Sequence, residues 1–168
     1  MNMIAFVRDY TIPAAYSLLP PAMASERATG MLLAIGLQES RFEHRAQTNG
    51  PANGFWQFEP NGVAAVLAHR ASQRYAREAI HDLKYEPDLF PVYDVLEHND
   101  VLAAVFARLL LWTLPAALPD PFEVEGGGAQ YLSAWRPGAV RRDPILHRAR
   151  WTTSHARAWA TLGEVRRA

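Results

Sequence analysis

The chain has 168 residues, of which 49% are apolar, and this suits one globular domain over residues 1–168 with a substantial core. It contains no cysteine, so disulfides, thiolate metal sites and a cysteine nucleophile are excluded. The 17 basic and 17 acidic side chains give a formal net charge of zero.

The charges are nevertheless segregated along the chain. Residues 78–125 are mostly acidic, whereas residues 136–168 carry eight arginines against Asp143 and Glu164. The basic segment could face a polyanion such as nucleic acid, a cell-wall polymer or a membrane surface, or it could fold back onto the acidic segment. We favour internal pairing because the net charge is neutral.

The first 20 residues do not read as a secretory signal, because no basic residue precedes their apolar part and Arg8 and Asp9 interrupt it. Further along, the apolar run at 109–119 is too short to span a bilayer and is broken by Pro115. We therefore expect a protein that is made in the cytoplasm and has no membrane anchor.

Apolar residues recur at three- and four-residue spacing, the period of a helix, in the segments 25–40, 61–83, 99–114 and 144–165. Ser25 is a candidate N-cap for the first, and Asn99 or Asp100 for the third. Residues 48–60 are rich in Asn, Gly and Pro, which predicts a loop or at most a small hairpin. Residues 125–132, "EGGGAQYL", predict a flexible turn into a helix, or a hinge. The fold class we predict is mainly α.

Glu39 ends the first of these helices, on the same side as Ile35 and Gly36. The helix is apolar nearly all round, so it should be buried with Glu39 emerging at its C-terminal end. Burial and the negative end of the helix dipole would both raise the pKa of this carboxyl group. A carboxylic acid that stays protonated near neutral pH is what cleavage of a glycosidic bond needs. The alternative is a glutamate at a frayed helix end that turns to solvent.

An aromatic cluster follows Gly54. Phe55, Trp56 and Phe58 could offer flat faces on which sugar rings stack. Alternatively they are core anchors, and some must be, since three large rings rarely all stay exposed.

These residues together resemble the signature of the soluble lytic transglycosylases and their goose-type lysozyme relatives. That signature begins with Glu-Ser, has Phe two residues after the Ser, then Ala, then Ser two residues beyond, and after a turn reaches Gly-Leu-Met-Gln followed closely by Pro. The segments "ESRFEHRAQT" and "GFWQFEP" supply the corresponding positions, which are Glu39, Ser40, Phe42, Ala46, Thr48, Gly54, Gln57 and Pro60. The match covers residues 31–60. A second family motif, Ala-Tyr-Asn-Ala-Gly, is echoed by "AWRPG", with Trp135 in place of the Tyr.

The resemblance implies a lysozyme-like α domain, with a small loop or hairpin at the cleft, that acts on peptidoglycan glycan strands. Glu39 would be the catalytic acid and base, cleaving the bond between N-acetylmuramic acid and N-acetylglucosamine with formation of a 1,6-anhydro ring. Gln57 and Thr48 occupy positions that line the cleft in the family, where they would bind the sugar N-acetyl groups or orient the acid. Alternatively, they stabilise the turn through side-chain to backbone hydrogen bonds.

Two departures from the family pattern matter. Glu59 stands where the family usually has an apolar residue, and a second carboxylate about 6.5–9.5 Å from the first could activate water and make the protein an inverting hydrolase. Glu59 could equally cap the following helix. Trp135 lacks the hydroxyl of the family Tyr, but Tyr131, four residues earlier on a predicted helix, could supply it from the same face.

No other chemical motif emerges. The histidines lack metal-ligand spacing and there is no phosphate loop, so we expect neither a metal nor a cofactor. A competing hypothesis is a nucleic-acid-binding module that uses Arg148, Arg150, Arg157, Trp151 and Trp159. We expect no nucleic-acid partner, because the two tryptophans lie two helical turns apart, which is first of all a core pattern. A third hypothesis is a catalytically inactive lysozyme-like scaffold.

The stretch around Glu39, in a small chain, also resembles lysozyme-like proteins of tailed bacteriophages and prophages. The resemblance implies either an endolysin that reaches the cell wall through a membrane pore, or a virion component that contacts other virion proteins and pierces the wall. The residues leave this choice open, together with transglycosylase or hydrolase chemistry, the host, the oligomeric state and the role of the basic C-terminal segment.

Overall fold

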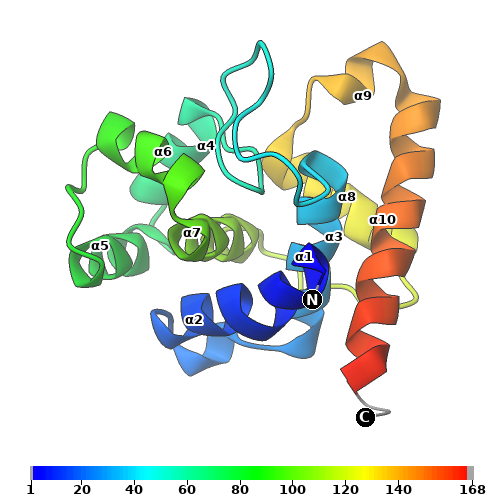
Figure 1. Cartoon of the computed structure of the whole chain (residues 1–168), viewed down its shortest axis with the longest axis horizontal. Helices are drawn as coiled ribbons and strands as arrows, with labels where there is room; N and C mark the ends of the chain where they lie inside the picture. The colour runs from blue at the N-terminus through cyan, green and yellow to red at the C-terminus, as the bar shows by residue number, and fades with distance from the viewer. Residues whose placement is uncertain (1, 166–168) are drawn as a thin grey trace.

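The computed structural model of the chain describes residues 2–165, and the side chains of all of these except 139, 140, 164 and 165. This part of the chain is mainly α-helical, as predicted, and contains isolated β-bridges but no strand (Figure 1). Its elements are α1 Met3–Phe6, η1 Val7–Thr11, α2 Ile12–Ser17, η2 Pro21–Met23, α3 Glu26–Glu39, α4 Pro60–Ala68, α5 Gln73–Asp82, α6 Leu89–His98, α7 Asp100–Trp112, α8 Val124–Trp135, α9 Ala139–Arg142 and α10 Pro144–Val165.

Helix α7 lies at the centre of the fold because its residues are apolar on nearly every side. It is buried from Leu102 to Leu111. The predicted cap at its start is Asn99, whose Oδ1 accepts a hydrogen bond of 3.0 Å from the amide of Leu102. Helices α2, α3, α4, α5, α6 and α8 all contact α7 (Figure 1). This helix therefore joins the N-terminal, middle and C-terminal parts of the chain into one core.

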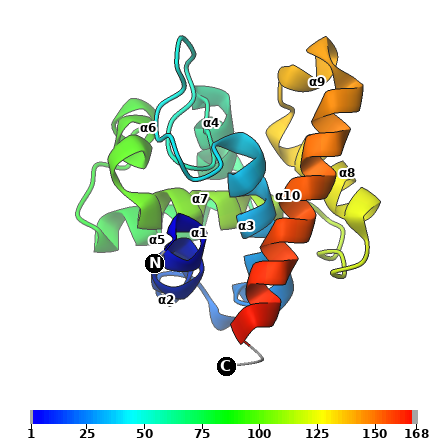
Figure 2. The ribbon, with the colours of Figure 1, turned by 45° about the vertical axis from the view of Figure 1, so that its right-hand side comes forward.

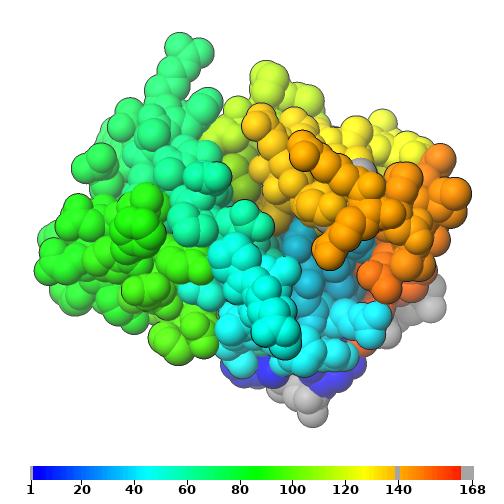
Figure 3. Space-filling view, turned by 90° about the horizontal axis from the view of Figure 1, so that it is seen from above, coloured from blue at the N-terminus to red at the C-terminus, as the bar shows by residue number. Residues whose placement is uncertain are grey.

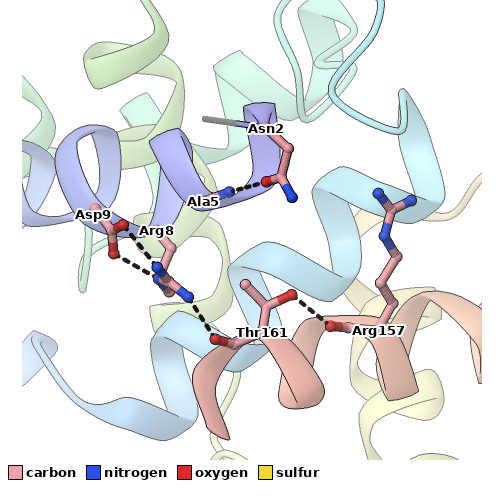
Figure 4. A network of polar contacts seen from close by, with 6 residues as sticks. All are labelled: Asn2, Ala5, Arg8, Asp9, Arg157 and Thr161. Carbon is pink, nitrogen blue, oxygen red and sulfur yellow. Dashed lines mark hydrogen bonds and ion pairs between the residues drawn. The ribbon is translucent and has the colours of Figure 1, made fainter. Parts of the chain in front are cut away.

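Residues 3–17 form a helical run whose middle turn is widened into the π-helical η1. Pro13 follows this turn; it has no amide hydrogen and its ring crowds the carbonyl four residues earlier, a conflict that a wider turn relieves. Arg8, on η1, pairs with Asp9 and donates a hydrogen bond of 2.6 Å to the carbonyl of Thr161. Figure 4 shows this contact, which ties the start of the chain to the end of α10.

Helix α3 begins at Ser25, as predicted, whose Oγ accepts a hydrogen bond of 3.1 Å from the amide of Ala28. Helix α10 lies along α3 (Figure 2). Gly30 allows this approach, because a Cβ atom there would lie only 2.5 Å from the ring of Trp159. The ring of Trp159 on α10 therefore packs directly against the backbone of α3 at Gly30, where any side chain would be in the way.

Helix α8 is docked on α10 in the same way. The glycines at 126–128 lie inside α8, so the predicted turn or hinge at 125–132 is wrong. A Cβ atom at Gly128 would lie 3.0 Å from Nε1 of Trp151, and one at Gly127 would lie 3.2 Å from its ring. Trp151 is only 4% exposed, as its helical spacing predicts. Close packing between the helices thus outweighs the low helix propensity of glycine.

The segment 61–83, predicted as one helical stretch, is divided between α4 and α5. His69 leaves the helix with extended backbone, and its Nδ1 accepts a hydrogen bond of 3.2 Å from the amide of Ala71. The hydroxyl of Ser72 donates to the carbonyl of Val66 at 2.7 Å. These side-chain to backbone bonds replace the helical ones, which explains the break.

Residues 40–59 connect α3 to α4 as a loop closed by the bridges of Asn53 with Ala46 and with Phe58. Phe42 is 2% exposed and lies over Gly36, where a Cβ atom would be 2.3 Å from its ring. The loop is thus anchored in the core at its start.

The predicted pairing between the basic C-terminal segment and the acidic middle is mostly wrong. Among the described side chains, only Arg148 of the C-terminal arginines forms an ion pair, at 2.7 Å with the exposed Glu125. The acidic segment pairs with other parts of the chain, Asp100 with Arg45 and Asp120 with Arg27. Apolar packing positions α10 instead. Arg166 and Arg167 lie outside the described residues.

Within residues 2–165, no helix is both long enough and apolar enough to cross a membrane.

We expect Gly36→Ala to destabilise the protein by about 1–3 kcal/mol, because the added methyl group overlaps the buried ring of Phe42. Gly163→Ala is the matched control, since that glycine is also helical and a Cβ atom there meets nothing within 4 Å. The control should be neutral or stabilising by up to about 1 kcal/mol. Denaturant unfolding measures both, and an equal effect of the two substitutions would contradict the packing described here.

Candidate functional site

Glu39 is the last residue of α3, and a buried serine fixes the helix end at which it lies. The hydroxyl of Ser40, which is 5% exposed, donates to the carbonyl of Phe55 at 2.7 Å and accepts from the amide of Phe42 at 3.1 Å. Arg41 and Phe42 follow with φ angles of +56° and +59°, so the chain turns sharply away. The end of α3 is therefore held in place, and the alternative of a frayed, solvent-turned Glu39 is wrong.

Tyr131 of α8 donates a hydrogen bond of 2.5 Å from its hydroxyl to Oε1 of Glu39. This confirms the predicted contact between Tyr131 and the acid. The tyrosine is 1% exposed, and its ring lies parallel to the rings of His147 and Trp151, with centroids 5.6 and 5.0 Å away. Two aromatic residues of α10 thus hold the hydroxyl against the carboxyl group.

His147 is a member of this site that the sequence reasoning missed. Its Nε2 lies 3.4 Å from the Tyr131 hydroxyl, and its side chain is buried. Burial and the nearby charge of Arg150 lower the pKa of His147, so the ring is neutral at neutral pH. A signal did exist: His147, Trp151, His155 and Trp159 recur every four residues, which places four rings on one face of α10.

Burial raises the pKa of Glu39 to about 7, and the negative charge of Glu59 pushes it in the same direction. The hydrogen bond from Tyr131 opposes this rise, because it stabilises the carboxylate. The pKa of Tyr131 is itself raised by burial and by the neighbouring acid, so its hydroxyl remains a donor. Glu39 can therefore both give and accept a proton near neutral pH, which is the requirement for general acid–base chemistry.

Glu39 faces two hollows in the surface. The Glu59 hollow, of about 450 Å³, is lined by Glu39 together with Phe58, Glu59, Asn61, Trp135 and Arg136, among others. The arginine hollow, of about 640 Å³, lies between the end of α3 and α10 and includes Arg41, Arg150 and Arg157. Figure 3 looks down on this face, where the loop of 41–58 and the segment of 136–150 lie on either side of the end of α3. A chain-like ligand at Glu39 could occupy both hollows.

Two of the predicted binding residues lie beside Glu39 in the Glu59 hollow. Trp135 is half-buried, and its Nε1 donates a hydrogen bond of 2.8 Å to the carbonyl of Trp56, which fixes the ring. Glu59 is exposed and precedes Pro60 at the start of α4, but its side chain makes no capping hydrogen bond. The structure thus brings together Glu39, Glu59, Tyr131 and Trp135.

The predicted stacking of sugars on Phe55 and Trp56 is wrong in this structure, because both rings are fully buried. They pack edge-on against Phe42, with ring centroids 5.4 and 5.9 Å apart. The indole of Trp56 also donates a hydrogen bond of 2.8 Å to the carbonyl of Leu32. Both residues are therefore part of the core, as the alternative interpretation of the sequence had it.

Gln57 and Thr48 are not among the residues that line either hollow. Gln57 has a φ of +50° and donates from its side-chain amide to the carbonyl of Gly54 at 2.8 Å, so it stabilises the turn. Thr48 is exposed in the loop. In this structure neither residue is placed to orient Glu39.

Comparison with known proteins adds no relative: the chain matches no family model, no curated protein and no solved structure. The function must therefore be argued from the chemistry of the site.

We expect Glu39→Gln to stabilise the protein at pH 8 but not at pH 4. The folded protein holds a proton on Glu39 up to a pKa of about 7, above the ordinary value of 4.5, so wild-type stability falls as the pH rises between these values. The variant has no ionisable group at this position, so at pH 8 its free energy of unfolding should exceed that of the wild type by up to about 2–3 kcal/mol. Denaturant unfolding at both pH values measures the difference. An equal gain at pH 4 and pH 8 would show that the gain does not come from ionisation.

Tyr131→Phe should raise the pKa of Glu39 further, because the hydrogen bond that stabilises its carboxylate is lost. Carbon-13 NMR of the labelled carboxyl group, followed through a pH titration, measures this value directly. Tyr10→Phe is the matched control, since Tyr10 is 55% exposed and does not touch Glu39. An unchanged or lowered pKa in Tyr131→Phe would remove the tyrosine from the control of the acid.

Proposed function

We propose that this protein cleaves the β-1,4 bond between N-acetylmuramic acid and N-acetylglucosamine in peptidoglycan, as a lytic transglycosylase with a lysozyme-like fold. Glu39 serves as both acid and base. The observation that carries the proposal is the state of this carboxyl group: its pKa is about 7, a tyrosine hydroxyl holds it at 2.5 Å, and it opens onto two hollows. The resemblance of residues 31–60 to the family signature supports the same assignment.

The reaction uses the two protonation states of Glu39 in turn. The protonated acid gives its proton to the glycosidic oxygen, the bond to C1 of the muramoyl ring breaks, and the ring becomes oxocarbenium-like. The resulting carboxylate then takes the proton of the muramoyl 6-hydroxyl, whose oxygen bonds to C1 and closes the 1,6-anhydro ring. No water is consumed, and Glu39 ends protonated as it began. A pKa near 7 suits a group that must do both steps.

Tyr131 and Trp135 assist in different ways. The tyrosine occupies Oε1 of Glu39, which leaves Oε2 to exchange the proton and stabilises the carboxylate between the two steps. Its position depends on His147 and Trp151, which stack against it. Trp135 lines the Glu59 hollow with a ring fixed by its hydrogen bond to Trp56, and such a ring offers a platform for a sugar.

Glu59 supports a second candidate function, hydrolysis by an inverting muramidase. It lines the same hollow as Glu39, its side chain is not used as a helix cap, and its charge raises the pKa of Glu39. In such an enzyme Glu59 would take a proton from water, which adds to C1 while Glu39 protonates the leaving oxygen. The product would then have a reducing end in place of the anhydro ring.

Mass spectrometry of the fragments released from purified peptidoglycan tests both functions. We expect products that end in 1,6-anhydromuramic acid, and we expect Glu39→Gln to lower the release rate by at least about 100-fold, because general acid catalysis contributes that much. Glu59→Gln should retain activity within a few-fold. The exposed Glu86→Gln, outside both hollows, is the matched control.

Products one water heavier, together with a loss in Glu59→Gln as large as in Glu39→Gln, would favour the hydrolase. No release by the folded wild-type protein would contradict both enzymes and favour the non-catalytic scaffold.

A further inference from the structure

We infer that the arginine hollow binds the carboxylates of the peptide stem carried by the muramoyl residue at the cleaved bond. This inference rests on the proposed function and concerns the part of the substrate that binds in the arginine hollow. Unlike the Glu59 hollow, the arginine hollow is lined by α10, by the last residues of α3 and by the first residues after it.

The position of the hollow follows from the way in which α10 docks on α3. Arg150, Thr153, Ser154 and Arg157 are spaced by three and four residues, so they share one face of α10 that looks onto the end of α3. The hydroxyl of Ser154 and the side-chain oxygen of Gln38 lie 3.2 Å apart, which holds the two walls together. Glu39 belongs to both hollows, so a ligand bound here is adjacent to the acid.

Three guanidinium groups without ion-pair partners give the hollow its charge. Arg41, Arg150 and Arg157 all line it, and among the described side chains no carboxylate lies within 4.0 Å of these three groups. Among the described residues that line the hollow, the one carboxylate besides that of Glu39 belongs to Glu43, which lies 3.9 Å from His44. The net charge of the lining is therefore positive.

Among the described side chains, no hydrogen bond or ion pair holds the guanidinium groups of these arginines elsewhere. In Figure 4 the guanidinium of Arg157 extends away from Arg8 and Thr161, and only its backbone carbonyl takes part in that network, accepting from the Thr161 hydroxyl at 2.8 Å. Arg148, two residues before Arg150 on α10, differs, since it pairs with Glu125 and lies outside the arginine hollow. Arg41, Arg150 and Arg157 are thus available to an anionic ligand.

Carboxylates are the anions that a peptidoglycan strand carries beside the bond to be cleaved. A guanidinium donates two parallel hydrogen bonds to a carboxylate, and this geometry suits arginine better than lysine. In the glycan strand only the muramoyl residue carries a lactyl-linked peptide, with free carboxylates, whereas the glucosamine residue is neutral. The neutral sugars then fit the Glu59 hollow, which contains Trp135, and the charged stem fits the arginine hollow.

The test compares glycan strands that carry stems with strands from which an amidase has removed them. We expect wild-type kcat/KM to fall by about tenfold or more on stripped strands, mainly through KM. The double variant Arg150→Gln/Arg157→Gln should show the same fall on stem-bearing strands and no change on stripped ones. Arg148→Gln is the matched control on the same helix. All three positions are exposed, so the variants should fold, which their unfolding midpoints check.

Binding by the Glu39→Gln protein separates this inference from the proposed function. Calorimetry should show that a disaccharide-peptide binds about tenfold more tightly than the bare disaccharide, and that the double variant removes the difference; this result would support the inference even if no strand were cleaved. Cleavage of both kinds of strand at equal rates would overturn the inference and leave the proposed function standing. A stem preference that the double variant retains would also overturn it. The inference would also be overturned if a DNA duplex or a phosphate-rich wall polymer bound more tightly than the disaccharide-peptide and the double variant abolished that binding.

Discussion

The hydrogen bond between Tyr131 and Glu39 is the contact on which the candidate site depends. It joins the last residue of α3 to a residue in the interior of α8 that lies 92 positions further along the chain. Without a donor there, a buried carboxylate would have no neutral partner to stabilise it and the acid would rarely ionise. Burial alone would raise the pKa of Glu39 further, and the hydrogen bond from Tyr131 limits the rise to a value of about 7. The aromatic residues of α10 matter because they hold this one hydroxyl in place.

Local patterns in the sequence predicted much of the framework. Ser25 and the apolar run after it located α3, Asn99 located the start of α7, and the spacing of Trp151 and Trp159 indicated a packed helix. Helical spacing also led from Trp135 to Tyr131 as the partner of the acid. The first three of these inferences needed only residues within a few turns of one another, whereas the pairing of Tyr131 with Glu39, 92 positions away, also needed the resemblance to the family motif.

Most of the incorrect or missing parts of the prediction depend on contacts between distant segments, whereas the break between α4 and α5 and the turn at Gln57 depend on local side-chain to backbone hydrogen bonds. An aromatic residue after a glycine reads the same in a core as on a surface, so nothing local marked Phe55 and Trp56 as buried. The glycines of α8 argue against a helix unless the tryptophan that fills their space is known. His147 becomes part of the site only when α10 crosses α8, and the two hollows exist only after α3, α8 and α10 have packed together.

Helix α10 combines two tasks, since it carries the arginines of one hollow and the rings that clamp Tyr131. Because Gly127 and Gly128 of α8 pack directly on Trp151, and Trp151 also stacks on Tyr131, a displacement of α10 would be transmitted to the tyrosine hydroxyl. A ligand held by Arg150 and Arg157 would therefore act on the same rigid body that sets the proton affinity of Glu39. Thermodynamic linkage makes such an effect reciprocal: whatever anion binding does to the acid, the ionisation of the acid does to anion binding. Because a bound anion disfavours the carboxylate of Glu39, the protonated acid, which begins and ends the proposed cycle, would be the form that binds the anion more tightly.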